Sequence, residues 1–167
     1  MIDDAIKPKG IYVQIEDFKR MKTVKLEARR HYIEYLRSRS RLRGIVFYNL
    51  SQLLKLSVKL GSKINYFDFP VVIASSYADA IKKADNILNN IGVTSDNLSA
   101  CVQNHKKQTT TSKADLWKIQ DDEYQLEYSI IDGRIIHAIS KGRLRMHHLP
   151  EMFKINERIL NTLDGPI

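Results

Sequence analysis

The chain has 167 residues, of which 43% are hydrophobic, and a formal net charge of +8 at pH 7. This length and composition predict one domain with a hydrophobic core rather than a disordered or fibrous protein. No run of about 18 apolar residues occurs, so we expect no membrane span, and the acidic N-terminus is not typical of a signal peptide. The single cysteine, Cys101, allows no internal disulfide, which favours a reducing, cytoplasmic location.

One segment carries the whole excess of positive charge. Residues 18–43 contain ten basic and two acidic side chains, and the rest of the chain is neutral. The basic residues are Lys19, Arg20, Lys22, Lys25, Arg29, Arg30, Arg37, Arg39, Arg41 and Arg43. Such local clustering indicates a binding surface or a solvated face.

The first elements alternate between strand and helix. Apolar residues at every second position predict a strand over residues 9–16, and a basic loop follows at 17–23. Thr23 is a plausible N-cap for an amphipathic helix over residues 24–40, whose face with Tyr32 and Tyr35 is apolar.

The clearest stretch of the sequence is 44–62. Residues 45–48 predict a strand that is covered on both faces, residues 49–51 offer capping side chains, and Gly61 is expected to end the helix that follows. A third strand at 71–75 then leads, through the cap Ser76, into a helix that ends before Gly92. The short connections favour a parallel sheet.

The second half of the chain has a different pattern. Polar residues dominate 93–113, which predicts a linker. Beyond it, Asp132 and Gly133 stand between two apolar strands and indicate a tight hairpin, and Pro150 suits the first turn of a last helix over 151–163.

We therefore expect an α/β protein with a mixed β-sheet. Residues 1–92 form a βαβαβα half-module, 93–113 a linker, and 114–167 a ββ(β)α half-module. The second unit is too small to be stable alone. It completes either the same sheet or, by exchange in a homodimer, the sheet of a second chain.

Taken in cyclic order, this arrangement resembles the STAS fold of bacterial anti-sigma-factor antagonists. The likeness rests on residues 135–144 (IIHAISKGRL), 11–23 (IYVQIEDFKRMKT) and 69–84 (FPVVIASSYADAIKKA). Family antagonists carry an Asp-Ser pair in the central-strand loop, whose serine a partner kinase phosphorylates. Here the corresponding residues are Lys22 and Thr23, so we interpret Thr23 as a helix cap rather than a phosphorylation site.

The resemblance implies a non-enzymatic bacterial regulatory module in signal transduction. It would act by protein-protein interaction with a kinase or another signalling protein. The partner face that the family implies comprises Lys19, Arg20, Lys22, Thr23, Arg29 and Arg30.

Two other functions remain open at this stage. The basic segment offers phosphate or nucleic-acid contacts, with Arg37, Arg39, Arg41 and Arg43 as further candidates, although no nucleic-acid-binding motif accompanies them. A small-molecule sensor would need a pocket, which a sequence does not reveal.

No catalytic, metal or cofactor site is expected. The chain has no phosphate loop, dinucleotide fingerprint, Gly-x-Ser-x-Gly elbow or HExxH pair. Adjacent His147 and His148, with His137 and His31, lack a cysteine or carboxylate at ligand spacing, and we expect the pair at the surface. Cys101 has no activating neighbour.

Overall fold

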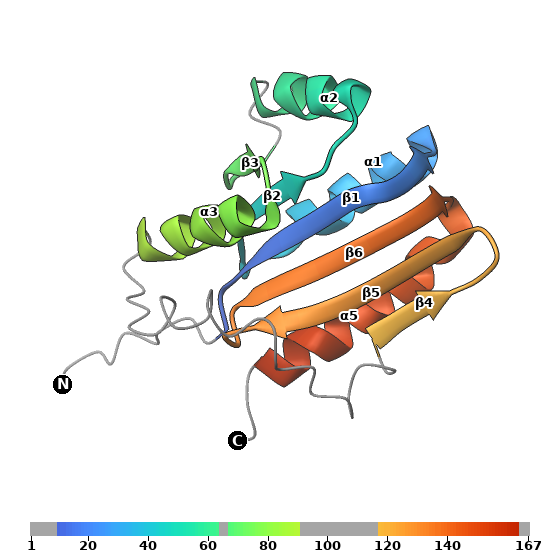
Figure 1. Ribbon diagram of the computed structural model, residues 1–167. Coiled ribbons are helices and arrows are strands. Elements are labelled where there is room, and N and C mark those ends of the chain that lie inside the picture. Colours follow the sequence, from blue (N-terminus) through green and yellow to red (C-terminus); the bar gives the residue numbers. More distant parts are fainter. Residues whose placement is uncertain (1–9, 64–66, 91–116, 164–167) are drawn as a thin grey trace.

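A six-stranded mixed sheet is the centre of the part of the chain that the computed structural model describes, which is residues 10–63, 67–90 and 117–163 (Figure 1). The strands are β1 (Tyr12–Val24), β2 (Leu42–Tyr48), β3 (Val71–Ile73), β4 (Lys118–Gln120), β5 (Tyr124–Ile131) and β6 (Ile135–Leu144). The helices are α1 (Leu26–Arg37), α2 (Gln52–Lys63), α3 (Tyr77–Asn90) and α5 (Leu149–Leu163), with a 3₁₀ turn, η2 (Met146–His148), before α5. The expectation of an α/β fold with a mixed sheet is confirmed.

The strand order is β3-β2-β1-β6-β5-β4. Strands β3, β2, β1 and β6 run parallel to one another, whereas β5 and β4 continue the sheet with antiparallel pairing. Strand β1 therefore lies in the middle, and β6 from the C-terminal half pairs with it along most of its length. The strands that precede and follow the predicted linker thus lie in one sheet.

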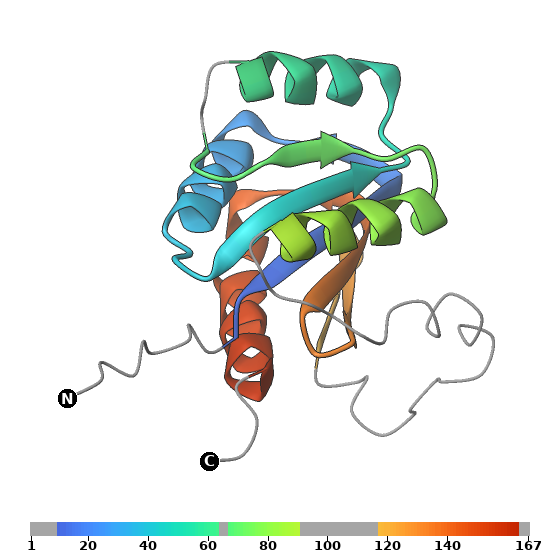
Figure 2. The ribbon, with the colours of Figure 1, turned by 90° about the vertical axis from the view of Figure 1, so that its left-hand side faces the viewer.

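Helices cover both faces of the sheet. Figures 1 and 2 show α1 and α5 on one face, α3 on the other, and α2 beside the β3 edge. The alternation of side chains along β1 sends Tyr12 into the core under α1 and α5, and Val13 and Ile15 into the core under α3. Each face of the sheet therefore packs into its own hydrophobic core.

The predicted hairpin between β5 and β6 is confirmed. Both Asp132 (φ 50°) and Gly133 (φ 65°) have the left-handed backbone that a tight hairpin turn needs, and the Arg134 amide donates to the Ile131 carbonyl at 3.2 Å. Farther along β6, Gly142 has φ 98°, and a Cβ placed there would lie 2.1 Å from the Glu123 carbonyl oxygen. Only glycine fits this close approach of β6 to the turn before β5.

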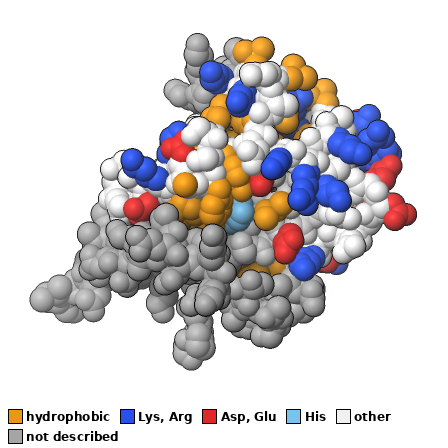
Figure 3. All heavy atoms as spheres, viewed as in Figure 1, with side chains coloured by type: hydrophobic (Ala, Val, Ile, Leu, Met, Phe, Trp, Pro, Cys, Tyr) orange, Lys and Arg blue, Asp and Glu red, His pale blue; other side chains and the backbone are white. Residues whose placement is uncertain are grey.

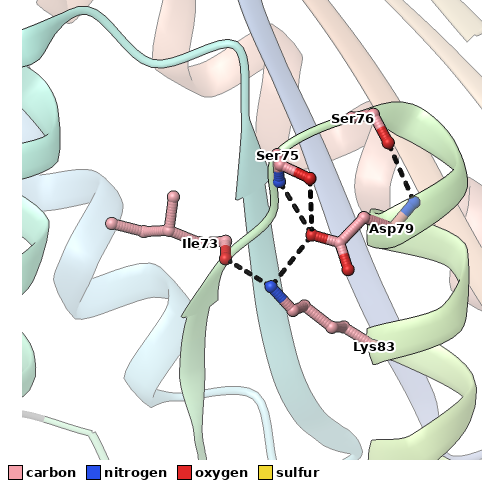
Figure 4. A network of polar contacts seen from close by, with 5 residues as sticks. All are labelled: Ile73, Ser75, Ser76, Asp79 and Lys83. Carbon is pink, nitrogen blue, oxygen red and sulfur yellow. Dashed lines mark hydrogen bonds and ion pairs between the residues drawn. The ribbon is translucent and has the colours of Figure 1, made fainter.

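The start of α3 is fixed by a polar network (Figure 4). Ser76 Oγ accepts the Asp79 amide at 3.2 Å, which confirms the predicted cap. In return, Asp79 Oδ2 accepts the Ser75 amide at 2.8 Å and the Lys83 ammonium at 3.0 Å. Lys83 also donates to the Ile73 carbonyl at 2.8 Å, so the network ties α3 to the end of β3. These donors lower the pKa of the Asp79 carboxyl, the Ser75 amide most of all.

The structure corrects four predicted boundaries. Residues 17–23 are not a loop, because β1 continues to Val24. Thr23 is therefore a strand residue, and the N-cap of α1 is Lys25, which makes no capping hydrogen bond through its side chain. Helix α1 ends at Arg37, before the predicted position 40, and α2 continues through Gly61 to Lys63. The predicted linker, 93–113, and Cys101 lie outside the described residues.

Candidate functional site

A cleft with a volume of about 620 Å³ lies where β1 and β6 end side by side. Because the two strands are parallel, their carboxyl ends meet at one edge of the sheet, and Arg20 pairs in register with Lys141. Five exposed cations line the cleft, and Figure 3 shows blue side chains gathered on this side of the molecule. They are Lys19, Arg20 and Lys22 from β1, and Lys141 and Arg143 from β6.

Acidic side chains form a second wall of this basic cleft, next to the β6 cations. Asp121, Asp122 and Glu123, in the turn between β4 and β5, line it together with the five cations. Glu123 pairs with Arg145 at 2.8 Å, outside the cleft lining. Within the described ranges, none of the five cations takes part in an ion pair with a carboxylate. Their charge is therefore open to a binding partner.

The acidic wall is held in place by hydrogen bonds from the backbone. Asp121 Oδ1 accepts the amides of Tyr124 at 2.6 Å and Glu123 at 2.7 Å, and Oδ2 lies 2.8 Å from His148 Nε2. The Tyr124 amide contributes most to a lowered pKa of the Asp121 carboxyl. Asp121 is thus ionised at neutral pH and holds the turn through its hydrogen bonds.

His148 lies differently from the prediction. It was expected at the surface, but only 3% of it is exposed, because its ring packs against Tyr124. In the described part of the chain, Asp121, His147 and His148 form one cluster of potential metal ligands. However, His148 Nδ1 accepts the Arg145 amide at 3.0 Å, and Nε2 faces Asp121. These contacts explain why His148 is buried, since its ring connects η2 to the β4–β5 turn.

The other two histidines lie elsewhere. His31 is exposed on α1, 3.5 Å from Glu34. His137 is buried on β6 with its Nε2 2.9 Å from the Tyr48 hydroxyl, and its ring contacts Tyr77 of α3. The structure therefore does not bring the four histidines considered from the sequence into one site.

A second hollow lies between the sheet, α1, α5 and α2. It is an apolar cavity of about 330 Å³ with a carboxyl group, Glu16, in its wall. Glu16 points from β1 to this side of the sheet and is 3% exposed. Its Oε1 accepts hydrogen bonds from the side-chain amide of Gln14 and from the Tyr32 hydroxyl. Burial raises the pKa of the Glu16 carboxyl to about 7, and the two hydrogen bonds oppose this rise.

The ten residues predicted as partner, phosphate or nucleic-acid contacts lie in three separate places. Lys19, Arg20 and Lys22 line the basic cleft, and Thr23 is exposed next to them on β1. Arg29 and Arg30, on α1, line the apolar cavity instead. The remaining candidates, at the far end of α1 and the start of β2, are Arg37, Arg39, Arg41 and Arg43.

The last group has mainly internal partners. Arg39 pairs with Glu157 of α5 and lies 4.2 Å from the centre of the Tyr35 ring. Arg41 donates to the Gly10 carbonyl at 3.0 Å, and Arg43 donates to the Ser40 carbonyl at 2.8 Å. Helix α1 has 12 residues, so this group lies about 18 Å from the cleft end of the helix. The basic segment does not form one continuous surface.

Sequence reasoning missed Lys141, Arg143 and Glu16. The two cations flank Gly142 in a strand that was recognised, but only the pairing of β6 with β1 brings them to Lys19, Arg20 and Lys22. For Glu16 a signal existed, because a carboxylate at an inward position of a buried strand is unusual.

Comparisons with protein-family models, curated proteins and solved structures give no match to this chain. None of the helices within the described residues is both long and apolar enough to cross a bilayer. A third hollow of about 410 Å³ is lined by Arg37, Arg39 and Arg43 together with Asp68.

Proposed function

We propose that this protein is a non-enzymatic, cytoplasmic regulatory module of the bacterial STAS-like type, which binds a signalling protein, such as a kinase, through the basic cleft. The observation that carries the proposal is the set of five cations without acidic partners among the described residues, gathered from two neighbouring strands. The order of elements supports the STAS-like type, since β4-β5-β6-α5 followed by β1-α1-β2-α2-β3-α3 is the cyclic order of that resemblance.

The mixed charge of the cleft favours a protein over a nucleic acid. A phosphate backbone is uniformly negative, and Asp121, Asp122 and Glu123 would repel it from one wall of the cleft. A protein segment can present acidic groups to Lys22 and Arg143 and basic groups to the acidic wall. Complementary charges of this kind steer association and set the register of a complex.

Nucleic-acid binding is the alternative, supported by the same cations. If all five contacted phosphates, the binding constant would fall about 500-fold between 50 and 200 mM salt. A labelled oligonucleotide titrated over this range by fluorescence anisotropy measures the slope. Weak binding without this steep dependence would rule the alternative out.

The direct test is capture of a partner from a bacterial lysate on the immobilised protein, after nuclease treatment. The variant Arg20→Glu/Lys22→Glu reverses two charges in the cleft, and Lys82→Glu reverses an exposed charge on α3 as the matched control. We expect one retained protein whose recovery falls at least tenfold with the cleft variant and is unchanged with the control. Equal recovery with both variants would contradict the proposal, and loss of the protein on nuclease treatment would point to nucleic acid.

Arg29 and Arg30 belong to the partner face that the resemblance implies, although they lie on α1. Arg29→Glu/Arg30→Glu in the same capture assay defines how far the face extends. Reduced recovery would include the start of α1 in the interface, whereas unchanged recovery would limit the interface to the cleft.

A further inference from the structure

The apolar cavity has the size and chemistry of a small-molecule site. Its volume of about 330 Å³ falls at the lower end of the range for such sites, about 300 to 1,000 Å³. Helix α2 forms one wall through Leu54 and Val58, and the sheet and α1 form the others. Most of the lining is apolar, with a few polar groups from the sheet and from α1, which is the usual composition of a ligand pocket.

Glu16 offers a hydrogen-bond acceptor to a ligand in the cavity. Glu16 Oε1 receives both the Gln14 and the Tyr32 hydrogen bonds. Within the described ranges, Glu16 Oε2 has no hydrogen-bond partner, although Glu16 lines the cavity. Tyr124 and Ser140, which also line it, lie 3.3 Å apart and satisfy each other. Above the Glu16 pKa of about 7 the carboxyl is ionised, and this buried acceptor beside an apolar space is then complementary to a ligand with one hydrogen-bond donor, so binding is measured at pH 8.

The lining also indicates the shape of the ligand. Six of the lining side chains in the described part of the chain are aromatic: Phe18, Tyr32, Phe47, Phe67, Tyr124 and Tyr128. Aromatic walls favour a flat ring that can pack in an offset or edge-to-face arrangement.

Ligand charge is restricted from two sides. Arg29 and Arg30 line the cavity and disfavour a cationic ligand, while Glu16 at the sheet side disfavours an anionic one. Arg30 and Leu26 are both exposed and both line the cavity, so the opening lies near the start of α1. Arg30 is thus at the exposed side of the cavity, whereas Glu16 is buried.

We propose that the cavity binds an uncharged, mainly apolar aromatic molecule with one hydrogen-bond donor, such as a phenol or an indole, whose donor bonds to Glu16. Among the described residues, Met21 alone lines both this cavity and the basic cleft, and Glu16 lines only the cavity, so the proposal does not depend on the protein partner. The protein thus recognises a small, uncharged phenol or indole in addition to its protein partner.

The test uses p-cresol as the probe and toluene as its analogue without the donor. Methionine methyl groups labelled with ¹³C report the site, because Met21 and Met152 line the cavity and Met146 is exposed outside it. We expect saturable shifts of the Met21 and Met152 signals, no shift of Met146, and binding of p-cresol about 2 to 10 times tighter than that of toluene. Benzylamine and benzoate serve as the charged analogues and are expected to bind more weakly than p-cresol.

Variants locate the site. Leu54→Trp fills the cavity from α2 and is expected to weaken p-cresol binding at least tenfold, whereas Leu53→Trp, one residue away and 75% exposed, leaves it unchanged. Val58→Phe is the second filling variant, in case Leu54→Trp does not fold. In Glu16→Met, which lacks the acceptor, the preference for p-cresol over toluene disappears.

Four outcomes would overturn the proposal. These are the absence of saturable shifts at Met21 and Met152, equal affinity for p-cresol and toluene in the unmodified protein, tighter binding of either charged analogue, and full binding in folded filling variants. The first and last outcomes would deny the cavity as a site. The other two would deny the chemistry assigned to its ligand.

Discussion

The buried carboxyl of Glu16 should make the stability of the protein fall as the pH rises. In the unfolded chain this group titrates at about 4.5, whereas in the folded protein its pKa is about 7. Below pH 4.5 both states are protonated, and between 4.5 and 7 only the folded state keeps the proton. Stability from this group is therefore complete below pH 4.5 and is lost as the pH rises through 7.

The size of the effect follows from the same two pKa values. At about 1.4 kcal/mol per pKa unit, the difference between 4.5 and about 7 corresponds to about 3 kcal/mol of unfolding free energy. The groups that face Glu16 do not reverse this sign. Tyr32 of α1 and Tyr128 of β5 have pKa values raised by burial and stay neutral in this range.

The assay is urea denaturation of the unmodified protein and of Glu16→Gln between pH 4.5 and 8. Comparing the two cancels the titration of all other groups, and the amide of glutamine keeps the shape of the side chain. We expect Glu16→Gln to gain about 3 kcal/mol relative to the unmodified protein across this range. Glu27→Gln, at an exposed position in the first turn of α1, is the control and should show no such trend. Parallel pH profiles for the unmodified protein and Glu16→Gln would refute the reasoning.

Three further predictions concern the fold. Gly142→Ala combines a left-handed backbone with a Cβ 2.1 Å from a carbonyl oxygen, so thermal melts should show a loss of about 3 kcal/mol of unfolding free energy. Gly133→Ala has the same backbone strain, but no atom beyond its chain neighbours lies within 4 Å of the added Cβ, so it should lose about 1 kcal/mol. Equal losses in the two variants would contradict this reasoning. Ser76→Ala removes the cap of α3 and should cost about 1 kcal/mol in urea denaturation, and no loss would show that Asp79 holds the helix start alone. Light scattering at increasing concentration should give a monomer of 19.4 kDa. The edge strands β3 and β4 have three residues each and therefore offer few backbone hydrogen bonds to a second chain. A stable dimer would instead favour exchange of the half-modules.

Much of the fold could be predicted because apolar periodicity within one segment decides it. The strand at 45–48, the helix after Ser76 and the turn at Asp132 and Gly133 each depend on residues close in sequence, and each is confirmed. Gly61 shows the limit of local rules. A glycine near the end of a helix can stop it, but it can also be tolerated inside, as in α2.

The sites could not be predicted in the same way, since they depend on contacts between distant segments. His148 was expected at the surface because it precedes the last helix and has no ligand partner nearby in sequence, yet Tyr124 and Asp121, more than 20 positions earlier, bury it. The arginines of the basic segment looked like one patch. Helix α1 separates Arg29 from Arg43, because a helix carries the chain from one end of the sheet to the other.

The wrong prediction of a loop at 17–23 has a cause that also explains how β1 lines both the basic cleft and the apolar cavity. The pairing of β1 with β6 shifts register between Asp17 and Arg20, and again between Met21 and Thr23. Such bulges insert an extra residue and re-aim the side chains that follow. The residues of β1 that line the cavity are Glu16, Phe18, Met21 and Val24, with a spacing of two and then three. The apolar residues therefore lose the period of two that is typical of a strand, and the sequence of this segment does not predict one. Side chains between the cavity positions, including Arg20 and Lys22, line the basic cleft. A single bulged strand thus presents an apolar row to one site and a basic row to the other.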